Sequence, residues 1–471
     1  MVILPELVLV IGALALFMVS LAKEPSKELT KSVAMAFGVA TFAATLVSFQ
    51  AKGLLFYDVY AVDQYSQLFK VLIGFSLVIA LIFGQYLKGI SPSIHAEYYL
   101  FLFLGVLGLM MLVSSIELIA IFISLELSSF ALYLLVPMRD DRTGLRAQME
   151  AGMKYILFGV MATGFMLYGM SLLFGLTGTT YLKGILVFLA SSPLQPAVVV
   201  AVLMVLAGFL YKLAVFPMHF WVPDVYQGAC NETAGVIATL PKFAAVALLI
   251  RFLVLPTGQS QLIVELLAVL ALCSMFYGNL CALVQKDFKR MLGFSGIAHA
   301  GFILLGLLTL NGEGYGIAIY YIAGYVLMNL ACFLVISQAS QEGENLLIDD
   351  LSGLYKRQPV LAFVLAAGLF GLAGIPPFIG FMGKFLVLTS ALRADHLIVV
   401  CLAAINTAIA IYYYLSVVKV AYTVEPDKKP EIAVHPVVQL SGIVLVVAIT
   451  LLGAFPGKFV DYASTVVQSL H

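Results

Sequence analysis

Residues 195–221 read QPAVVVAVLMVLAGFLYKLAVFPMHFW, and this stretch decides what kind of fold the chain adopts. It stays apolar for roughly the 20 residues that a helix needs to cross a lipid bilayer. Two residues stand out: Lys212 lies inside the apolar run, and Pro217 follows it. A charged side chain at the bilayer centre costs about 2.5–3.5 kcal/mol, and proline breaks or kinks a helix. The stretch therefore predicts a transmembrane helix that is broken beside a buried cation.

The same apolar pattern recurs along the chain. Of the 471 residues, 62% are hydrophobic and 11% are charged, whereas soluble domains carry about 25% charged residues. We predict an all-α polytopic membrane protein of about fourteen transmembrane helices, the first of them a helix and not a removed signal peptide. The approximate spans are 2–21, 31–49, 66–87, 97–114, 116–137, 147–175, 195–221, 229–254, 262–283, 290–310, 315–339, 359–389, 396–421 and 436–456.

Basic residues gather on alternate loops of this helix series. About fifteen of the 25 lysines and arginines fall on one side and about four on the other. The first side carries Lys23, Lys27, Lys31, Lys88, Arg139, Arg142, Arg146, Lys286, Lys289, Arg290, Lys356, Arg357, Lys419, Lys428 and Lys429. Under the positive-inside rule this side is cytoplasmic, and an even number of helices then places both termini outside.

Two interrupted helices indicate an internal repeat. AVFP at 214–217 interrupts the seventh predicted helix, and AGIPP at 373–377 interrupts the twelfth, about 160 residues later. Broken helices in corresponding halves mark transport sites at repeat interfaces. We therefore predict two inverted repeats of five helices between an N-terminal three-helix segment and a C-terminal helix. The four units span residues 1–96, 97–254 (helices 4–8), 255–421 (helices 9–13) and 422–471.

Four ionisable residues lie too deep in their predicted helices to reach the membrane surface. They are Glu126 in the fifth helix, Lys212 in the seventh, Lys242 in the eighth and Lys384 in the twelfth. Static ion pairs between helices are the simplest explanation, but three lysines face one carboxylate. Because burial disfavours a charged lysine and a nearby carboxylate favours it, such lysines can load and release a proton. We interpret the four residues as a row that moves ions, most simply protons.

Prolines accompany these lysines. Pro217, Pro241 and Pro376 are each predicted to break a helix and to free backbone carbonyls inside the membrane. Those carbonyls need water or a neighbouring helix as partner, and water beside a buried lysine is what a proton path requires. A kink without a function is the alternative.

Other polar residues have secondary or open roles. His299 is interpreted as a proton relay or as a hydrogen-bonded core residue, and Lys154 either pairs with Glu150 or feeds the path. We predict interfacial anchoring for Lys70, Arg251 and Glu265, either anchoring or an entrance for His219 and Asp224, and either channel lining or helix packing for Asn279, Asn329, Ser128 and Thr407.

Several chemistries have no motif in this chain. There is no G-x-x-x-x-G-K-[ST] loop for ATP and no Rossmann fingerprint for a nicotinamide. The five cysteines form no CxxC pair, and the net charge is zero, so neither a metal site nor a nucleic-acid partner is predicted. The energy for transport must then come from a partner or from an ion gradient.

Four stretches read SLELSSFALYLLV (124–136), YKLAVFPMHFWVPDVYQGA (211–229), KRMLGFSGIAHAGF (289–302) and AGIPPFIGFMGKFLVL (373–388). In these stretches, and over nearly its whole length, the chain resembles the antiporter-like membrane subunits of respiratory complex I. Within that family it is most similar to the chain N branch of NADH–quinone oxidoreductase, homologous to mitochondrial subunit 2.

The resemblance implies a proton-translocating subunit of a bacterial inner-membrane enzyme, NADH:quinone oxidoreductase, with protons moving from cytoplasm to periplasm. It implies that Glu126 and Lys212 form the principal pair and that Lys242 and Lys384 continue the row. Quinone reduction elsewhere would drive transport. NADH, FMN, iron–sulfur clusters and quinone would bind to partner subunits, and this chain would hold no cofactor, metal or redox site. The expected partners are neighbouring antiporter-like and small membrane subunits.

One segment departs from the family pattern. After VYQGA the family usually continues with alanine, proline and threonine, whereas this chain has Cys230, Asn231, Glu232 and Thr233. Glu232 adds a carboxylate below Lys242. We predict that it sits at the interface, the alternative being that it modifies the proton entrance.

Three other functions compete with this one. The chain could belong to a multi-subunit cation/proton antiporter, to a related redox-driven ion pump, or to an inert membrane scaffold. Neighbouring genes for NADH-oxidising and iron–sulfur subunits would favour complex I, and replacement of Lys212 by alanine would test the scaffold.

Overall fold

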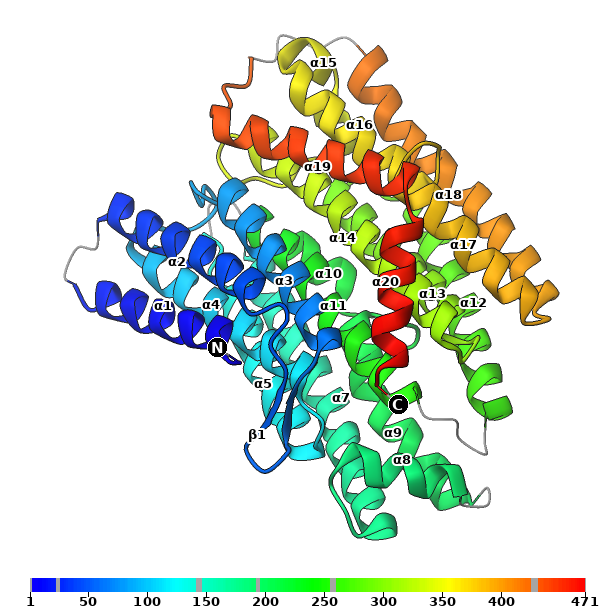
Figure 1. Ribbon diagram of the computed structural model, residues 1–471. Coiled ribbons are helices and arrows are strands. Elements are labelled where there is room, and N and C mark those ends of the chain that lie inside the picture. The colour runs from blue at the N-terminus through cyan, green and yellow to red at the C-terminus, as the bar shows by residue number, and fades with distance from the viewer. Residues whose placement is uncertain are drawn as a thin grey trace.

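The computed structural model describes residues 2–22, 26–140, 146–191, 195–254, 260–424 and 431–470. Of the basic residues that predicted the orientation, Lys23, Arg142, Lys428 and Lys429 lie outside these ranges. The described chain is almost entirely helical (Figure 1), with one short antiparallel hairpin of β1 (Gly53–Leu55) and β2 (Tyr60–Val62).

Long helices fill the molecule. In chain order the helices are α1 (Leu4–Ser20), α2 (Lys27–Val47), α3 (Gln64–Phe83), η1 (Pro92–Ile94), α4 (His95–Ser114), α5 (Leu118–Leu135), α7 (Ala147–Thr177), α8 (Leu182–Ser191), α9 (Pro196–Leu213), α10 (Val222–Gly228), α11 (Asn231–Leu253), α12 (Ser260–Ala282), α13 (Phe288–Leu307), α14 (Gly312–Ala339), η2 (Ile348–Leu351), α15 (Leu354–Arg357), α16 (Pro359–Ala373), α17 (Ile379–Arg393), α18 (Leu397–Thr423), α19 (Pro436–Ala454) and α20 (Gly457–Gln468). Among the described residues, 12 helical spans are long and apolar enough to cross a membrane, and α1 and α16 are shorter apolar helices. Every predicted apolar segment contains a helix, so the all-α polytopic fold is confirmed.

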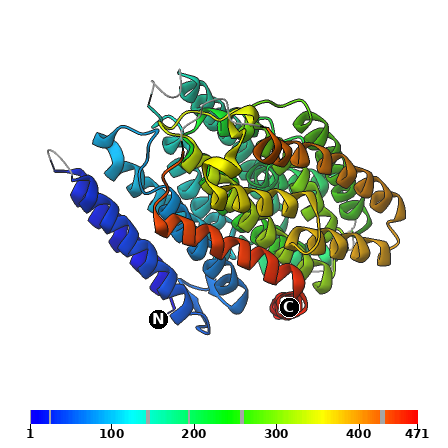
Figure 2. The same ribbon diagram turned by 90° about the horizontal axis from the view of Figure 1, so that it is seen from above.

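The predicted spans do not include the hairpin, η1, α8, α10, η2, α15 or α20. Each is too short or too polar to give a membrane-spanning signal. The last of them, α20, is seen end-on in Figure 2, whereas α19 runs across that view, so the chain turns sharply between them. It packs on the first turns of α14, where Gly316 leaves room for the backbone of Ser464.

Polar caps begin several of the helices that matter for function. The Asp63 carboxylate accepts a hydrogen bond from the backbone of Ser66 at 2.7 Å, and the Ser66 hydroxyl lies 3.0 Å from the backbone nitrogen of Asp63, from which it accepts in return. Asp287 caps α13 and Asn311 caps α14 in the same general way. These side chains satisfy backbone N–H groups that have no partner within the helix.

The two predicted interruptions at Pro217 and Pro376 are present. α9 ends at Leu213 and α10 begins at Val222, and α16 ends at Ala373 before α17 begins at Ile379. The residue after each first half, Ala214 or Gly374, has a left-handed backbone with φ of 67° or 86°. In both cases the next N–H bonds back to a carbonyl five residues earlier, at 2.9 Å. The two breaks therefore share one local geometry, and the division into two inverted repeats stays a prediction.

The predicted break at Pro241 is wrong. α11 runs unbroken through Pro241, and all 23 of its residues are buried. The proline removes the bond that its N–H would give to the carbonyl of Ile237, but neighbouring helices surround α11 and hold it in place. Sequence spacing alone does not reveal this support.

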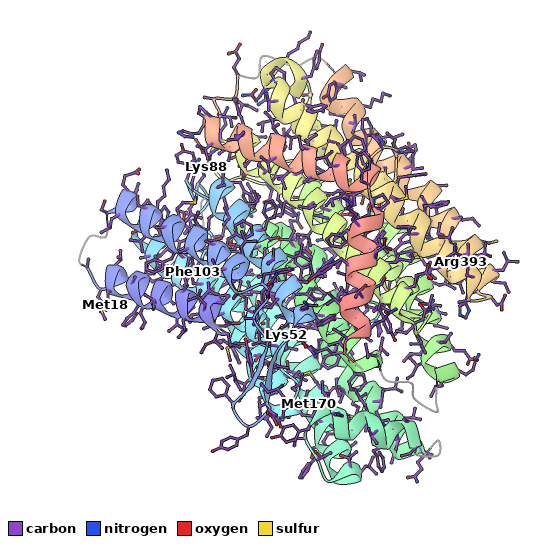
Figure 3. The ribbon with its side chains drawn as sticks, viewed as in Figure 1. Met18, Lys52, Lys88, Phe103, Met170 and Arg393 are labelled. Carbon is purple, nitrogen blue, oxygen red and sulfur yellow. The ribbon has the colours of Figure 1, made fainter. Side chains whose placement is uncertain are left out.

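We call the end of the bundle that holds Lys88, where most basic residues were predicted to lie, the basic end. Figure 3 shows Lys88 at one end and Lys52 and Arg393 toward the other. Two basic residues predicted to face the cytoplasm, Arg139 and Lys289, are instead buried at 3% and 0% exposure. Arg139 donates to the carbonyls of residues 227–229, and Lys289 donates to Ala229 at 2.7 Å. Both side chains thus satisfy carbonyls where α10 ends.

Candidate functional site

Lys212 lies in the last turn of α9 and is 4% exposed. Its ammonium donates to the hydroxyls of Ser128 and Ser129 on α5, both at 2.9 Å. Glu126 lies on the same helix, is only half-buried, and forms no ion pair with Lys212. Its Oε1 atom is buried and has no hydrogen-bond partner among the described residues. Glu126 precedes these serines on α5, but among the described residues it forms neither an ion pair with Lys212 nor a hydrogen bond with either serine.

Lys242 lies on α11 at the centre of the bundle and is 1% exposed. Its ammonium donates to the Tyr325 hydroxyl of α14 at 2.8 Å and to the carbonyl of Gly296 on α13 at 3.2 Å. It also lies 4.5 Å from the centre of the Tyr325 ring. A Cβ atom at Gly296 would stand 2.9 Å from this ammonium, so only glycine fits there without displacing it.

His299 continues the polar group from α13. Its Nδ1 lies 2.8 Å from the Tyr321 hydroxyl and its Nε2 lies 3.2 Å from the Tyr414 hydroxyl. The ring centre is 5.2 Å from that of Tyr325, the partner of Lys242. His299 is thus a buried, hydrogen-bonded histidine beside the lysine row, and its role as a proton relay stays a prediction.

Lys384 lies on α17, beyond the second break. Its ammonium turns back to the end of α16 and donates to the carbonyls of Leu372 and Ala373 at 2.9 and 3.1 Å. It lies 5.3 Å from the ring centre of Phe302, one turn from His299 on α13. The structure therefore joins Lys242, His299 and Lys384 in one group and places Lys212 with Glu126 in another.

Two other buried cations have carboxylate partners. Lys70 is fully buried and pairs with Glu6 at 2.7 Å, and Arg251 pairs with Asp63 at 2.9 Å. The prediction that Lys70 and Arg251 reach the interface is therefore wrong, because α1 and the segment before α3 bring a carboxylate to each. Glu265 is exposed, as predicted.

Lys154 belongs to a separate network at the basic end of the bundle. It pairs with Glu150 and with Asp224, both at 2.7 Å, and Asp224 also binds Arg290 at 2.6 Å. Burial raises the pKa of Asp224, but the hydrogen bonds from Lys154 and Arg290 outweigh it and hold that pKa below its usual range. Neither group of the lysine row contacts Lys154. His219 is buried against aromatic rings, and both of its nitrogens lack a partner among the described residues.

Glu232 corrects a further prediction. It was expected at the interface, but its exposure is 3%. The turn after α3 covers it, since a Cβ atom on Gly84 would lie 3.4 Å from its Cγ atom. Of the secondary polar residues, Ser128, Asn279 and Asn329 are buried inside the bundle, whereas Thr407 bonds to its own helix.

Sequence reasoning named Ser128 but missed the tyrosine partners of the row. Tyr321, Tyr325 and Asn329 follow one another at intervals of four on α14, which places them on one helix face. That spacing was visible in the sequence, but so many aromatic residues line the apolar segments that it carried no specific signal. Ser129 and Gly296 were also missed, because single small residues are common in these helices.

The lysines of the row have no carboxylate partner among the described residues, unlike the buried cations Lys70 and Arg251. Each lysine of the row bonds only to hydroxyl or carbonyl oxygens among the described residues, whereas Lys70 and Arg251 bond to carboxylates. The fold and this site define a polytopic membrane protein with ionisable groups buried beside two broken helices.

Comparisons with known proteins agree with that class. A family model described as NADH:quinone oxidoreductase/Mrp antiporter, TM, matches residues 115–410. The chain is 50% identical over 460 residues to NADH-quinone oxidoreductase subunit N 2 of Opitutus terrae, covering 97% of this chain and 96% of that one. A chain of respiratory complex I from Thermus thermophilus superposes with a TM-score of 0.84 at 30% identity, covering 97% and 98%. A chain of the Mrp complex from Dietzia shares the fold alone, with a TM-score of 0.87 at 20% identity over 99% of this chain and 97% of that one.

The chain therefore belongs to the family of antiporter-like membrane subunits of NADH-quinone oxidoreductase, in its subunit N branch. Members of this family are multi-span membrane subunits of a larger enzyme complex.

Proposed function

We propose that this chain translocates protons from the cytoplasm to the periplasm as a subunit of an NADH-quinone oxidoreductase. The observation that supports this most is the nature of the lysine partners. Lys212, Lys242 and Lys384 are at most 4% exposed, and among the described residues their ammonium groups form hydrogen bonds to neutral oxygens only. A buried cation without a counter-ion is costly, so its retention needs a purpose beyond packing.

Hydroxyl partners suit a lysine that gains and loses a proton. A hydroxyl accepts a hydrogen bond from an ammonium and donates one to a neutral amine, because it carries both a proton and lone pairs. Ser128, Ser129 and Tyr325 are such partners. A carboxylate would instead hold the ammonium in its charged form, as Glu6 does for Lys70.

We assign Glu126, Lys212, Lys242 and Lys384 as proton carriers and His299 as a relay between the last two. We assign Lys154 a structural role, because both of its partners, Glu150 and Asp224, are carboxylates at the basic end of the bundle. We further propose that quinone reduction in partner subunits supplies the energy, that NADH, FMN, iron–sulfur clusters and quinone bind there, and that neighbouring antiporter-like and small membrane subunits contact this chain. Both termini would then lie in the periplasm.

The test is proton translocation by the assembled complex in vesicles after Lys212→Ala. We expect the rate to fall at least tenfold, with the complex still assembled. Lys458→Ala is the matched control, because Lys458 is exposed on α20, outside the predicted spans. Undiminished translocation by an assembled Lys212→Ala complex would defeat the proposal, and transport that vanishes without sodium would favour a cation/proton antiporter.

A further inference from the structure

Glu232 is a buried acid that the proposed row does not use. It lies in the first turn of α11 and is 3% exposed. Its Oε2 atom has no hydrogen-bond partner, and the carboxylate makes no ion pair within 4.0 Å among the described residues. Leaving an oxygen of a buried carboxylate without a partner costs more free energy than leaving a neutral polar group without one.

A purely structural role does not account for this cost. An acid in the first turn stabilises a helix through its dipole, and an exposed acid can do this as well. The cap of α11 is already supplied by Cys230, whose sulfur accepts from the backbone of Thr233. The burial of Glu232 therefore calls for another explanation.

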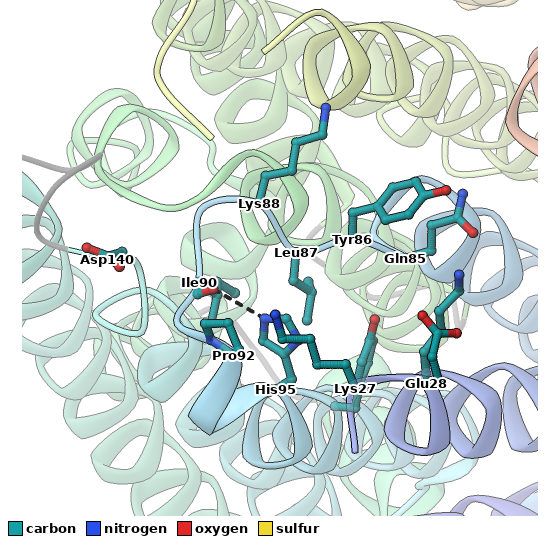
Figure 4. Close-up of a pocket in the computed structure, with 12 residues that line it drawn as sticks. Lys27, Glu28, Gln85, Tyr86, Leu87, Lys88, Ile90, Pro92, His95 and Asp140 are labelled. Atoms are coloured by element: carbon teal, nitrogen blue, oxygen red, sulfur yellow. Dashed lines mark hydrogen bonds between the residues drawn. The ribbon is translucent and has the colours of Figure 1, made fainter. Parts of the chain in front are cut away.

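A polar cavity lies on the other side of the turn that covers Glu232. It has a volume of about 350 Å³, and we call it the vestibule. Figure 4 shows its polar lining, which includes Lys27, Gln85, Lys88 and His95. The wall between vestibule and acid is thin: Tyr99 lines the cavity and donates to the carbonyl of Gly84, whose Cα faces the Glu232 side chain.

Lys88 lies between the vestibule and the segment that carries the acid. It lines the cavity, and a Cβ atom on the next residue, Gly89, would lie 3.3 Å from the Cβ atom of Cys230, two residues before Glu232. The Lys88 ammonium is held in place by the carbonyls of Ser337 and Ser340, at 3.3 and 2.8 Å. A proton that enters the vestibule thus comes close to the Glu232 carboxylate. The ammonium of Lys88 is fixed nearby and forms no ion pair with that carboxylate.

Buried polar atoms continue from Glu232 toward the row. Lys242 follows ten residues later on α11, or about 15 Å along the helix. On the adjoining α14, Asn329 is fully buried and its Oδ1 atom has no partner among the described residues. Its amide bonds to the backbone of Tyr325, whose hydroxyl receives the Lys242 ammonium. Buried polar atoms without a protein partner are the places where water binds inside proteins.

We propose that Glu232 takes up protons from the vestibule and passes them inward, past Asn329 and Tyr325, to Lys242. This inference rests on the proposed function. In each cycle the carboxylate gains one proton from water in the vestibule, and the neutral amine of Lys242 receives one proton through water bound beside the unpartnered oxygens and through the Tyr325 hydroxyl. Glu232 returns to its charged form, so the step balances without any redox change.

The test uses the assembled complex in vesicles, with proton translocation measured beside quinone reduction. Glu232→Gln keeps the shape of the side chain and removes its ability to take up a proton, so we expect translocation to fall about tenfold. Glu232→Asp keeps the acid and is expected to retain at least half of the rate. Glu342→Gln is the matched control, an exposed glutamate at the same end of the bundle.

The outcomes separate the two proposals. If Lys212→Ala abolishes translocation while Glu232→Gln leaves it unchanged, the uptake role of Glu232 is refuted and the proposed function stands. If Gln and Asp lower translocation equally, the side chain has only a structural role. Should Glu232→Gln fail to assemble, Asn329→Leu tests the same route further in, and an unchanged rate would overturn it.

Discussion

The hydroxyl of Tyr325 offers the most direct test of how the row works. Tyr325→Phe removes one of the two hydrogen-bond acceptors of the Lys242 ammonium and leaves the 3.2 Å bond to Gly296 and the ring itself. A hydrogen bond to a charged group contributes about 1.5–3 kcal/mol. If that bond is lost in the step that loads Lys242, translocation slows by about 10- to 150-fold.

The assay is the initial rate of proton translocation by vesicles that contain the assembled complex. Tyr320→Phe is the control, because Tyr320 lies on the same helix and its hydroxyl donates at 2.8 Å to a backbone carbonyl, that of Leu452. The two variants lose the same atom and differ only in the partner. A Tyr325→Phe rate within twofold of the Tyr320→Phe rate would refute the role of this hydroxyl.

Three further predictions follow from the packing and charges. Gly296→Ala places a methyl group 2.9 Å from the Lys242 ammonium and should slow translocation at least tenfold, whereas Gly293→Ala, with nothing closer than 3.4 Å, should not. Lys154 and Arg290 lower the pKa of Asp224, so the stability that they confer is present at neutral pH and is lost as the pH falls through that lowered pKa. The melting temperature of Asp224→Asn should therefore lie below that of the unmodified protein at neutral pH, and the difference should shrink in acid. A difference that stays constant with pH would contradict this. Tyr57→Cys on the hairpin should react with an impermeant thiol reagent from outside intact cells and Glu342→Cys only after lysis; the reverse pattern would invert the proposed orientation.

The sequence predicted the structure correctly where the evidence is a spacing of residues along one helix. The apolar spans, the two breaks and the depth of Lys212, Lys242 and Lys384 depend on spacing along one helix, and the structure agrees with each. A lysine ten residues into an apolar run is buried whatever its neighbours are.

The sequence was uninformative where the outcome depends on which helices touch. Lys70 was expected at the surface because nothing along α3 shows that α1 brings Glu6 to it. Pro241 was expected to break a helix because the sequence does not show that neighbouring helices surround α11 and support it. Glu232 was placed at the interface because the covering turn at Gly84 lies about 150 residues away in the chain.

The end of α16 has a consequence for how charge is balanced at Lys384. The carbonyls of Leu372 and Ala373 are the negative pole of a helix, equivalent to about half an elementary charge. Unlike an aspartate or a glutamate, this pole cannot itself be neutralised by a proton. The backbone thus supplies a permanent partial negative charge, and of the two partners in this contact only the lysine titrates. The strength of that partial charge depends on the direction of α16, which a side-chain substitution leaves unchanged.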